Sequence, residues 1–306
     1  MHKACIFQQQ IIPSSSEDSL KRSILFFLTM TLLSFTHLAV SEAVPQKRVP
    51  VKAAVVMDAN GAVLYSKFPN AKLAPASTVK LVTAMVVLDR LAPDTRVKVS
   101  KNASKVRTIS PKLCPDEELT VSALLHLALM RSINSAAVAL AEAAAGTEDE
   151  FAVLMNRKAQ EIGANTTLFA NATGLPKGRQ YTTANDLVLI LKAALAYPFI
   201  REVLGKKEAL IRTSEGRELY VDNSNDLLWY EQNMIGGKTG YTGNARHCFV
   251  CAINTEKGPL FTAVLGARSR RGLWKSTLLL NELVLKQPEL ALHNAKTPVV
   301  PAVSHQ

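Results

Sequence analysis

The sequence has 306 residues, of which 48% are hydrophobic and 20% are charged. This composition is typical of a folded protein with one large domain or two lobes, and it excludes an intrinsically disordered chain. The net charge is +11, but aromatic and basic residues do not interleave as they do in grooves that bind nucleic-acid strands, so we expect no nucleic-acid partner. The excess of basic residues is best explained as a solubilising surface, and it also suits peripheral association with an anionic membrane or the cell wall.

The first predicted element is an export signal. Lys21 and Arg22 precede an apolar stretch at 23–33, and small residues follow at 41–43. This order is typical of a secretory signal peptide, which we assign to residues 1–43. The stretch is long enough to cross a membrane, but its Thr, Ser and His residues make it a poor anchor. We therefore expect an exported, periplasmic or cell-envelope protein on the outer face of the cytoplasmic membrane.

A folded domain is predicted over residues 44–286. It starts with a β-hairpin, because apolar runs at 51–58 and 62–66 flank Asn60-Gly61, the strongest short hairpin signal. A helix that is apolar nearly all round starts at Ser77, so we expect it to be buried. The later elements are helices after Thr120 and at 135–145, 148–162 and 183–195, strands at 219–221, from 235, at 248–253 and at 260–266, and a last helix at 273–285. Residues 287–306 are predicted to form a flexible tail.

The order of these elements predicts the fold class. Strands lie at both ends of the domain and helices occupy its middle, which indicates an α/β (α+β) protein. We expect one antiparallel sheet assembled from N- and C-terminal segments and flanked by helices, plus an all-helical lobe.

The cysteines do not indicate a metal or redox site. Cys248 and Cys251 form a C-x-x-C pattern inside a predicted strand, where residues three apart point to opposite faces. A redox C-x-x-C requires a helix N-terminus, and a zinc site requires a second pair of ligands. We therefore assign both cysteines to the sheet core, and we expect no metal and no cofactor.

Three short motifs carry the candidate chemistry. Ser77 and Lys80 start the buried helix and share one face, with Cβ atoms about 5–6 Å apart. Ser132-Ile133-Asn134 lies at a break between two predicted helices, and Lys238-Thr239-Gly240 lies in a glycine-rich strand, where a ligand can approach the backbone. Taken alone, the first motif also fits a helix-capping serine and a lysine that extends into solvent.

The combination of the motifs is more specific than any one of them. A phosphate loop is excluded, because Gln232 stands where that motif needs a glycine and no helix follows. In order and spacing, the motifs resemble those of low-molecular-mass penicillin-binding proteins, the D-alanyl-D-alanine carboxypeptidase/endopeptidase family of active-site-serine S-x-x-K enzymes. The resemblance covers roughly residues 50–285 and includes stretches at 171–175, 182–187 and 237–242. It implies a β-lactamase/transpeptidase-like fold.

The resemblance also implies three catalytic roles. Ser77 is expected to be the nucleophile that forms an acyl-enzyme, Lys80 the general base, and Ser132 the relay of a proton to the leaving group. An ordinary lysine pKa of about 10.4 leaves fewer than roughly one lysine in a thousand neutral at pH 7. Burial and a nearby second cation, Lys238, are expected to lower the pKa of Lys80.

Substrate-binding roles follow from the same resemblance. Asn134 is expected to hold the amide side of the substrate, and Lys238 and Thr239 its carboxylate. The backbone N–H of Tyr241, after Gly240 on the glycine-rich strand, is expected to form the oxyanion hole with that of the serine nucleophile.

Two residues depart from the family pattern. Ser224 aligns with an arginine of many carboxypeptidases, and Arg246 stands where a glycine is usual. We expect both departures to affect how the terminal carboxylate is held. The length of the chain is closer to that of the short endopeptidase-like members than to the larger carboxypeptidases with an extra β-domain and anchor helix.

The predicted function is a serine-type D-Ala-D-Ala carboxypeptidase acting on peptidoglycan stem peptides, with β-lactam antibiotics as inhibitors. A D,D-endopeptidase that cuts peptidoglycan cross-links remains open. A class A-like β-lactamase requires an E-x-x-L-N loop between the second and third motifs, and the sequence has none there. A non-catalytic envelope-binding module would use the same cleft and basic surface.

Overall fold

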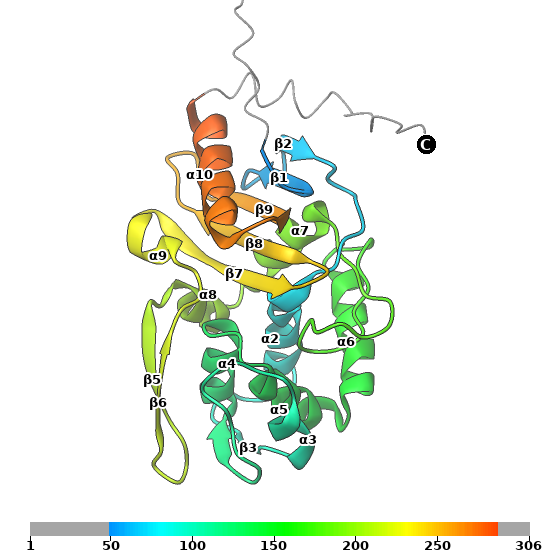
Figure 1. The fold of residues 1–306 in the computed structure, drawn as a ribbon, viewed down its shortest axis with the longest axis vertical. Helices are drawn as coiled ribbons and strands as arrows, with labels where there is room; N and C mark the ends of the chain where they lie inside the picture. The colour runs from blue at the N-terminus through cyan, green and yellow to red at the C-terminus, as the bar shows by residue number, and fades with distance from the viewer. Residues whose placement is uncertain (1–48, 287–306) are drawn as a thin grey trace, which may run out of the picture. The chain divides into compact units, whose positions relative to one another are not determined.

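The computed structural model of the protein describes residues 49–286 (Figure 1). The predicted signal peptide and the predicted tail both lie outside the described residues. Within 49–286, no helix combines the length and the apolar character that a membrane crossing requires.

The central sheet has five antiparallel strands in the order β2-β1-β9-β8-β7. It joins N- and C-terminal segments, as the sequence predicts: the strands are β1 (Ala53–Met57), β2 (Val63–Lys67), β7 (Met234–Thr242), β8 (Arg246–Ile253) and β9 (Leu260–Ala267). The Asn60-Gly61 turn joins β1 to β2. Asp58 Oδ1 stabilises this turn by accepting hydrogen bonds from the backbone of Asn60 at 2.9 Å and of Ala62 at 2.8 Å. Strand β7 lies at the edge of the sheet, next to the Ser77 segment (Figure 1).

Both faces of the sheet are covered by helices. Helix α10 (Arg270–Lys286) packs on one face and α7 (Ala184–Ala194) on the other, so successive residues of a strand enter different hydrophobic clusters. Cys248 belongs to the cluster on the α7 face and Cys251 to the cluster on the α10 face. Burial raises the pKa of the Cys248 thiol to about 11. The predicted sheet-core role of both cysteines is therefore confirmed.

The predicted helices of the middle segment are present, with small shifts at their ends. They are α4 (Val121–Leu129), α5 (Asn134–Ala145) and α6 (Glu148–Glu161), and Thr120 caps α4 by accepting from the backbone N–H of Ala123. The predicted strand at 219–221 is present as β6 (Glu218–Asp222), which forms a hairpin with β5 (Glu208–Arg212). The sequence did not indicate β5 or the other short elements, namely β3 (Arg96–Lys98) with β4 (Glu118–Thr120), α3 (Lys101–Lys105), α8 (Pro198–Gly205) and α9 (Leu227–Tyr230). The three-residue strands are too short for an alternating pattern to identify them.

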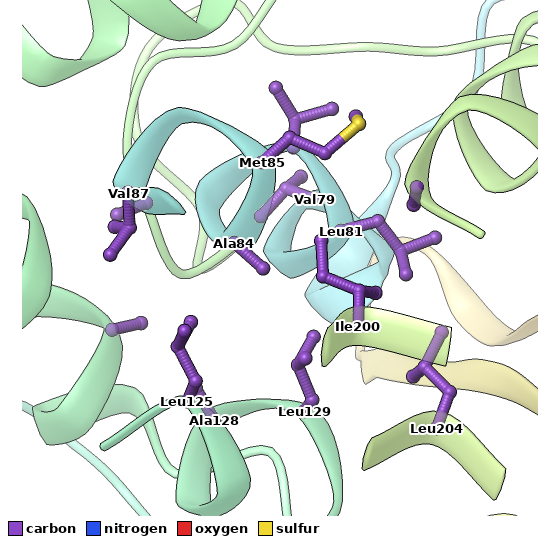
Figure 2. Packing of buried hydrophobic residues seen from close by; sticks show 14 of the residues in the cluster. Val79, Leu81, Ala84, Met85, Val87, Leu125, Ala128, Leu129, Ile200 and Leu204 are labelled. Carbon is purple, nitrogen blue, oxygen red and sulfur yellow. The ribbon is translucent and has the colours of Figure 1, made fainter. Parts of the chain in front are cut away.

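The Ser77 segment begins as a 3₁₀ turn, η1 (Ala76–Val79), and continues as helix α2 (Lys80–Leu88). All α2 residues except Leu88 are buried, which confirms the prediction of a central helix. Figure 2 shows side chains of α2 facing Leu125 and Leu129 of α4, with Ile200 of α8 beside them. This packing fixes α2 between the helices of the lobe and the edge of the sheet.

Candidate active site

Two glycines allow the backbone around Ser77 to pack closely. A Cβ atom at Gly174 would lie 1.9 Å from the carbonyl oxygen of Ala76, and Gly174 has a φ of +81°. A Cβ atom at Gly240 would lie 2.9 Å from the backbone nitrogen of Ser77. Any side chain at these positions would push the segments apart. Strand β7 therefore lies directly against the η1 turn, with Gly240 in contact with the Ser77 backbone.

Lys80 is enclosed by three oxygen atoms. Its Nζ lies 3.1 Å from Ser77 Oγ, 2.7 Å from Asn134 Oδ1 and 2.7 Å from the carbonyl oxygen of Thr173. A neutral amine has two N–H donors and one lone pair. The amide and carbonyl oxygens can only accept, whereas the serine hydroxyl can donate. These neighbours therefore match a neutral Lys80 whose lone pair faces Ser77.

The electrostatic surroundings also favour the neutral form. Lys80 is 1% exposed, and burial is the largest cause that lowers its pKa well below the ordinary value, followed by the positive charge of Lys238, while Glu148 opposes the shift. Lys238 is also fully buried, which lowers its own pKa to about 7. The expectation that burial and Lys238 together lower the pKa of Lys80 is confirmed, and burial is the larger effect. The alternative of a solvent-exposed lysine is wrong.

Asn134 is oriented by the segment that precedes α4. Its backbone N–H donates to Thr108 Oγ1 at 2.9 Å, and its Nδ2 donates to the carbonyl oxygen of Arg107 at 2.7 Å. Because Nδ2 faces the Arg107 carbonyl, the other polar side-chain atom, Oδ1, faces Lys80. The first residue of α5 is thus held in one orientation.

Ser132 lies in the break between α4 and α5 with a strained backbone. Its φ of +65° is in the left-handed region, which costs a non-glycine residue on the order of 1–3 kcal/mol and is frequent at functional sites. Its Oγ is buried and has no hydrogen-bond partner among the described residues. Neighbouring contacts hold the loop: the backbone N–H of Ser224 donates to the Met130 carbonyl at 2.9 Å, and Arg131 forms an ion pair with Asp222 at 2.8 Å.

The segment after β6 also reaches strand β7. Ser224 Oγ lies 2.6 Å from Thr239 Oγ1, so the two hydroxyls share one hydrogen bond. Arg270 donates to the Ser224 carbonyl at 2.9 Å and pairs with Asp226 at 2.7 Å. Ser224 therefore connects the Ser132 loop to the Lys238-Thr239-Gly240 strand. Tyr241 turns its ring outward, where it stacks on His247 with a centroid distance of 4.5 Å.

The structure brings four of the eight predicted site residues into one contact group. Ser77, Lys80 and Asn134 form one hydrogen-bonded group, and Gly240 of β7 contacts it. Ser132 is near in the chain to Asn134, but its hydroxyl forms no hydrogen bond with any of the other predicted residues. The sequence did not indicate the Thr173 carbonyl as a Lys80 partner; the only signal was the family-like stretch at 171–175.

Comparisons with known proteins agree with this geometry. Residues 39–269 match the model of the Peptidase S11 family, described as D-alanyl-D-alanine carboxypeptidase. The chain is 33% identical over 222 residues to the D-alanyl-D-alanine carboxypeptidase DacF of Bacillus subtilis, covering 71% of this chain and 57% of that protein's length. It is also 33% identical over 234 residues to the D-alanyl-D-alanine endopeptidase of Escherichia coli, covering 75% of each.

A solved structure confirms the predicted fold class. A variant of the Streptomyces K15 DD-transpeptidase superposes with a TM-score of 0.72 and 27% sequence identity, covering 76% of this chain and 97% of that one. The motifs, the fold and the family match agree: the chain belongs to the Peptidase S11 family of serine-type D-alanyl-D-alanine peptidases, which are hydrolases.

Proposed function

We propose that the protein is a D-Ala-D-Ala carboxypeptidase that removes the terminal D-Ala of peptidoglycan stem peptides through an acyl-enzyme on Ser77. The observation that carries this proposal is the buried Lys80, with Nζ 3.1 Å from Ser77 Oγ. Because its pKa is lowered, Lys80 is suited to accept the Ser77 proton as general base near neutral pH. Export to the cell envelope follows from this substrate.

In the proposed acylation, Ser77 Oγ attacks the carbonyl carbon of the penultimate D-Ala while its proton moves to Lys80. Backbone N–H groups of Ser77 and Tyr241 stabilise the negative oxygen of the tetrahedral intermediate. The peptide C–N bond then breaks, and the leaving amine takes a proton from Ser132, which is replenished from Lys80. Water hydrolyses the resulting ester and releases the shortened peptide.

The remaining predicted residues would position the substrate. Lys238 and Thr239 would bind the terminal carboxylate, since a buried ammonium and a hydroxyl are strong donors to that group. Asn134 would contact the amide side of the acyl part. The unpartnered Ser132 hydroxyl supports its role as a relay, because no hydrogen bond within residues 49–286 occupies it.

Labelling with a fluorescent penicillin tests the acyl-enzyme. The intact protein is expected to become covalently labelled at Ser77, identified by peptide mass spectrometry, and Ser77→Ala is expected to remain unlabelled. A folded wild-type protein that takes up no label would overturn the proposal. Rapid release of hydrolysed penicillin would instead indicate a β-lactamase.

A D,D-endopeptidase is the second candidate, since the similar Escherichia coli protein has that name. Digestion of purified cross-linked and uncross-linked muropeptides separates the two activities. Loss of a terminal D-Ala supports the carboxypeptidase, and cleavage of the cross-link supports the endopeptidase. Binding to peptidoglycan without either product would indicate a non-catalytic module.

A further inference from the structure

Arg246 has an unusual conformation at the turn between β7 and β8. Its φ is +61°, in the left-handed region that glycine adopts most easily and that commonly closes short hairpin loops. The side chain is exposed, and within residues 49–286 it forms no ion pair or side-chain hydrogen bond. Such backbone strain persists where the surrounding structure requires the residue, and often at ligand-binding sites.

The strand register places Arg246 on the catalytic face of the hairpin. Arg246 pairs with Thr242 across the two strands, and directly opposed residues share one face of a sheet. Because side chains alternate along a strand, Thr242 shares this face with Gly240 and Lys238. This is the face on which Gly240 meets the Ser77 backbone. Arg246 is therefore on the same side of the sheet as Lys238, whereas Thr239 faces the other side; a peptide along the outer edge of β7 can meet side chains of both faces.

The order of groups along β7 gives the direction of the substrate; this step rests on the proposed function. The terminal carboxylate is bound at Lys238 and Thr239, and the scissile carbonyl at the N–H of Tyr241. Thr239 and Tyr241 are two residues, or about 7 Å, apart along the strand. The acyl part of the peptide continues in the same direction, so the residue before the scissile D-Ala reaches the β7–β8 turn.

We propose that Arg246 is a specificity-determining residue that recognises a second, side-chain carboxylate in the residue before D-Ala-D-Ala. The favoured substrates are stem peptides in which this residue carries a free carboxylate, as a diaminopimelate-type residue does. Peptides with an amidated side chain, or with lysine at that position, are poorer substrates. A guanidinium binds a carboxylate through charge-assisted hydrogen bonds, and the exposed position keeps the effect moderate.

The test uses three synthetic peptides of the form acyl-X-D-Ala-D-Ala. X is a residue with a free side-chain carboxylate, the same residue amidated, or lysine. For the wild-type protein, kcat/KM for the carboxylate peptide is expected to exceed that for the amide by about three- to tenfold, and lysine is expected to be poorest. In Arg246→Gln this carboxylate-to-amide ratio is expected to fall below about twofold, and Arg246→Lys to retain part of it.

Arg271→Gln is the matched control, because Arg271 is also an exposed arginine but lies on α10. This variant is expected to keep the wild-type ratio. Arg246→Gly removes the side chain but keeps a residue that adopts a positive φ easily. A low carboxylate-to-amide ratio in this variant therefore reports the loss of the guanidinium and not a misfolded turn. The inference is overturned if the wild-type protein has equal kcat/KM values for all three peptides, or if Arg246→Gln keeps the wild-type carboxylate-to-amide ratio. Penicillin labelling in the same preparation would then still support the proposed enzyme. Absence of labelling overturns the proposed function and the inference together.

Discussion

The two buried lysines of the site are held in different ways. Lys80 has three oxygen neighbours, from Ser77, Asn134 and Thr173, and no donor or lone pair is left over in its neutral form. Lys238 is as deeply buried, yet within residues 49–286 its Nζ donates only to the carbonyl oxygen of Thr239, at 3.1 Å. A buried amine with unused donors is costly unless a ligand uses them.

This difference separates a proton acceptor from a binding group. The enclosure of Lys80 fixes its lone pair toward one hydroxyl, which suits proton transfer and leaves no capacity for a substrate carboxylate. The unused donors of Lys238 suit a ligand, and carboxylate binding would return charge to an amine whose pKa burial has lowered to about 7. Burial thus serves proton transfer at Lys80 and ligand binding at Lys238.

The largest effect is expected from removing the enclosed lysine. Lys80→Met fills a similar volume but cannot accept the Ser77 proton, so penicillin acylation is expected to fall by about 10³-fold or more. Stopped-flow measurement of acylation checks this, with circular dichroism to establish folding. Lys257→Met, an exposed lysine in the β8–β9 turn, is expected to acylate as the wild type does. A loss of less than tenfold in Lys80→Met would contradict the assignment of Lys80 as base.

Much of this site could be predicted from the sequence, for identifiable physical reasons. Ser77 and Lys80 stand out because charged and polar groups rarely begin an apolar helix, and the glycines near Lys238 mark a strand that another segment approaches. The Thr173 carbonyl could not be predicted, because a backbone acceptor has no side-chain signature. The positive φ of Ser132 also depends on tertiary contacts, through Met130 and Arg131, that no local pattern reveals.

An intermediate effect is expected from Lys238→Ala, which tests how the two lysines are coupled. Loss of the carboxylate-binding ammonium is expected to lower kcat/KM by about 10²-fold. The charge of Lys238 lowers the pKa of Lys80, so its removal raises that pKa. Because Lys80 must be neutral to act as base, the acid limb of the pH–rate profile is expected to move to higher pH.

The pH profile of acylation, rather than the rate alone, decides this prediction. Lys275→Ala on α10 serves as the control, since that lysine is exposed, and its acid limb is expected to match the wild type. An acid limb that stays in place in Lys238→Ala would show that burial alone sets the pKa of Lys80.

The smallest effect is expected at the contact that connects the two sides of the site. Ser224→Ala removes the hydroxyl that lies 2.6 Å from Thr239 Oγ1, so Thr239 loses the partner that orients it toward the carboxylate. The loss of one hydrogen bond, about 0.5–1.5 kcal/mol, corresponds to a two- to tenfold change. Since it concerns carboxylate binding, the change is expected in KM with kcat nearly unchanged, and only for peptides with a free terminal carboxylate. Ser224→Thr, which keeps the hydroxyl, is expected to restore KM. An equal loss on carboxylate and carboxamide peptides would contradict a role of the Ser224 hydroxyl in orienting Thr239 toward the carboxylate, because the backbone contact of Ser224 with Met130 is kept in this variant.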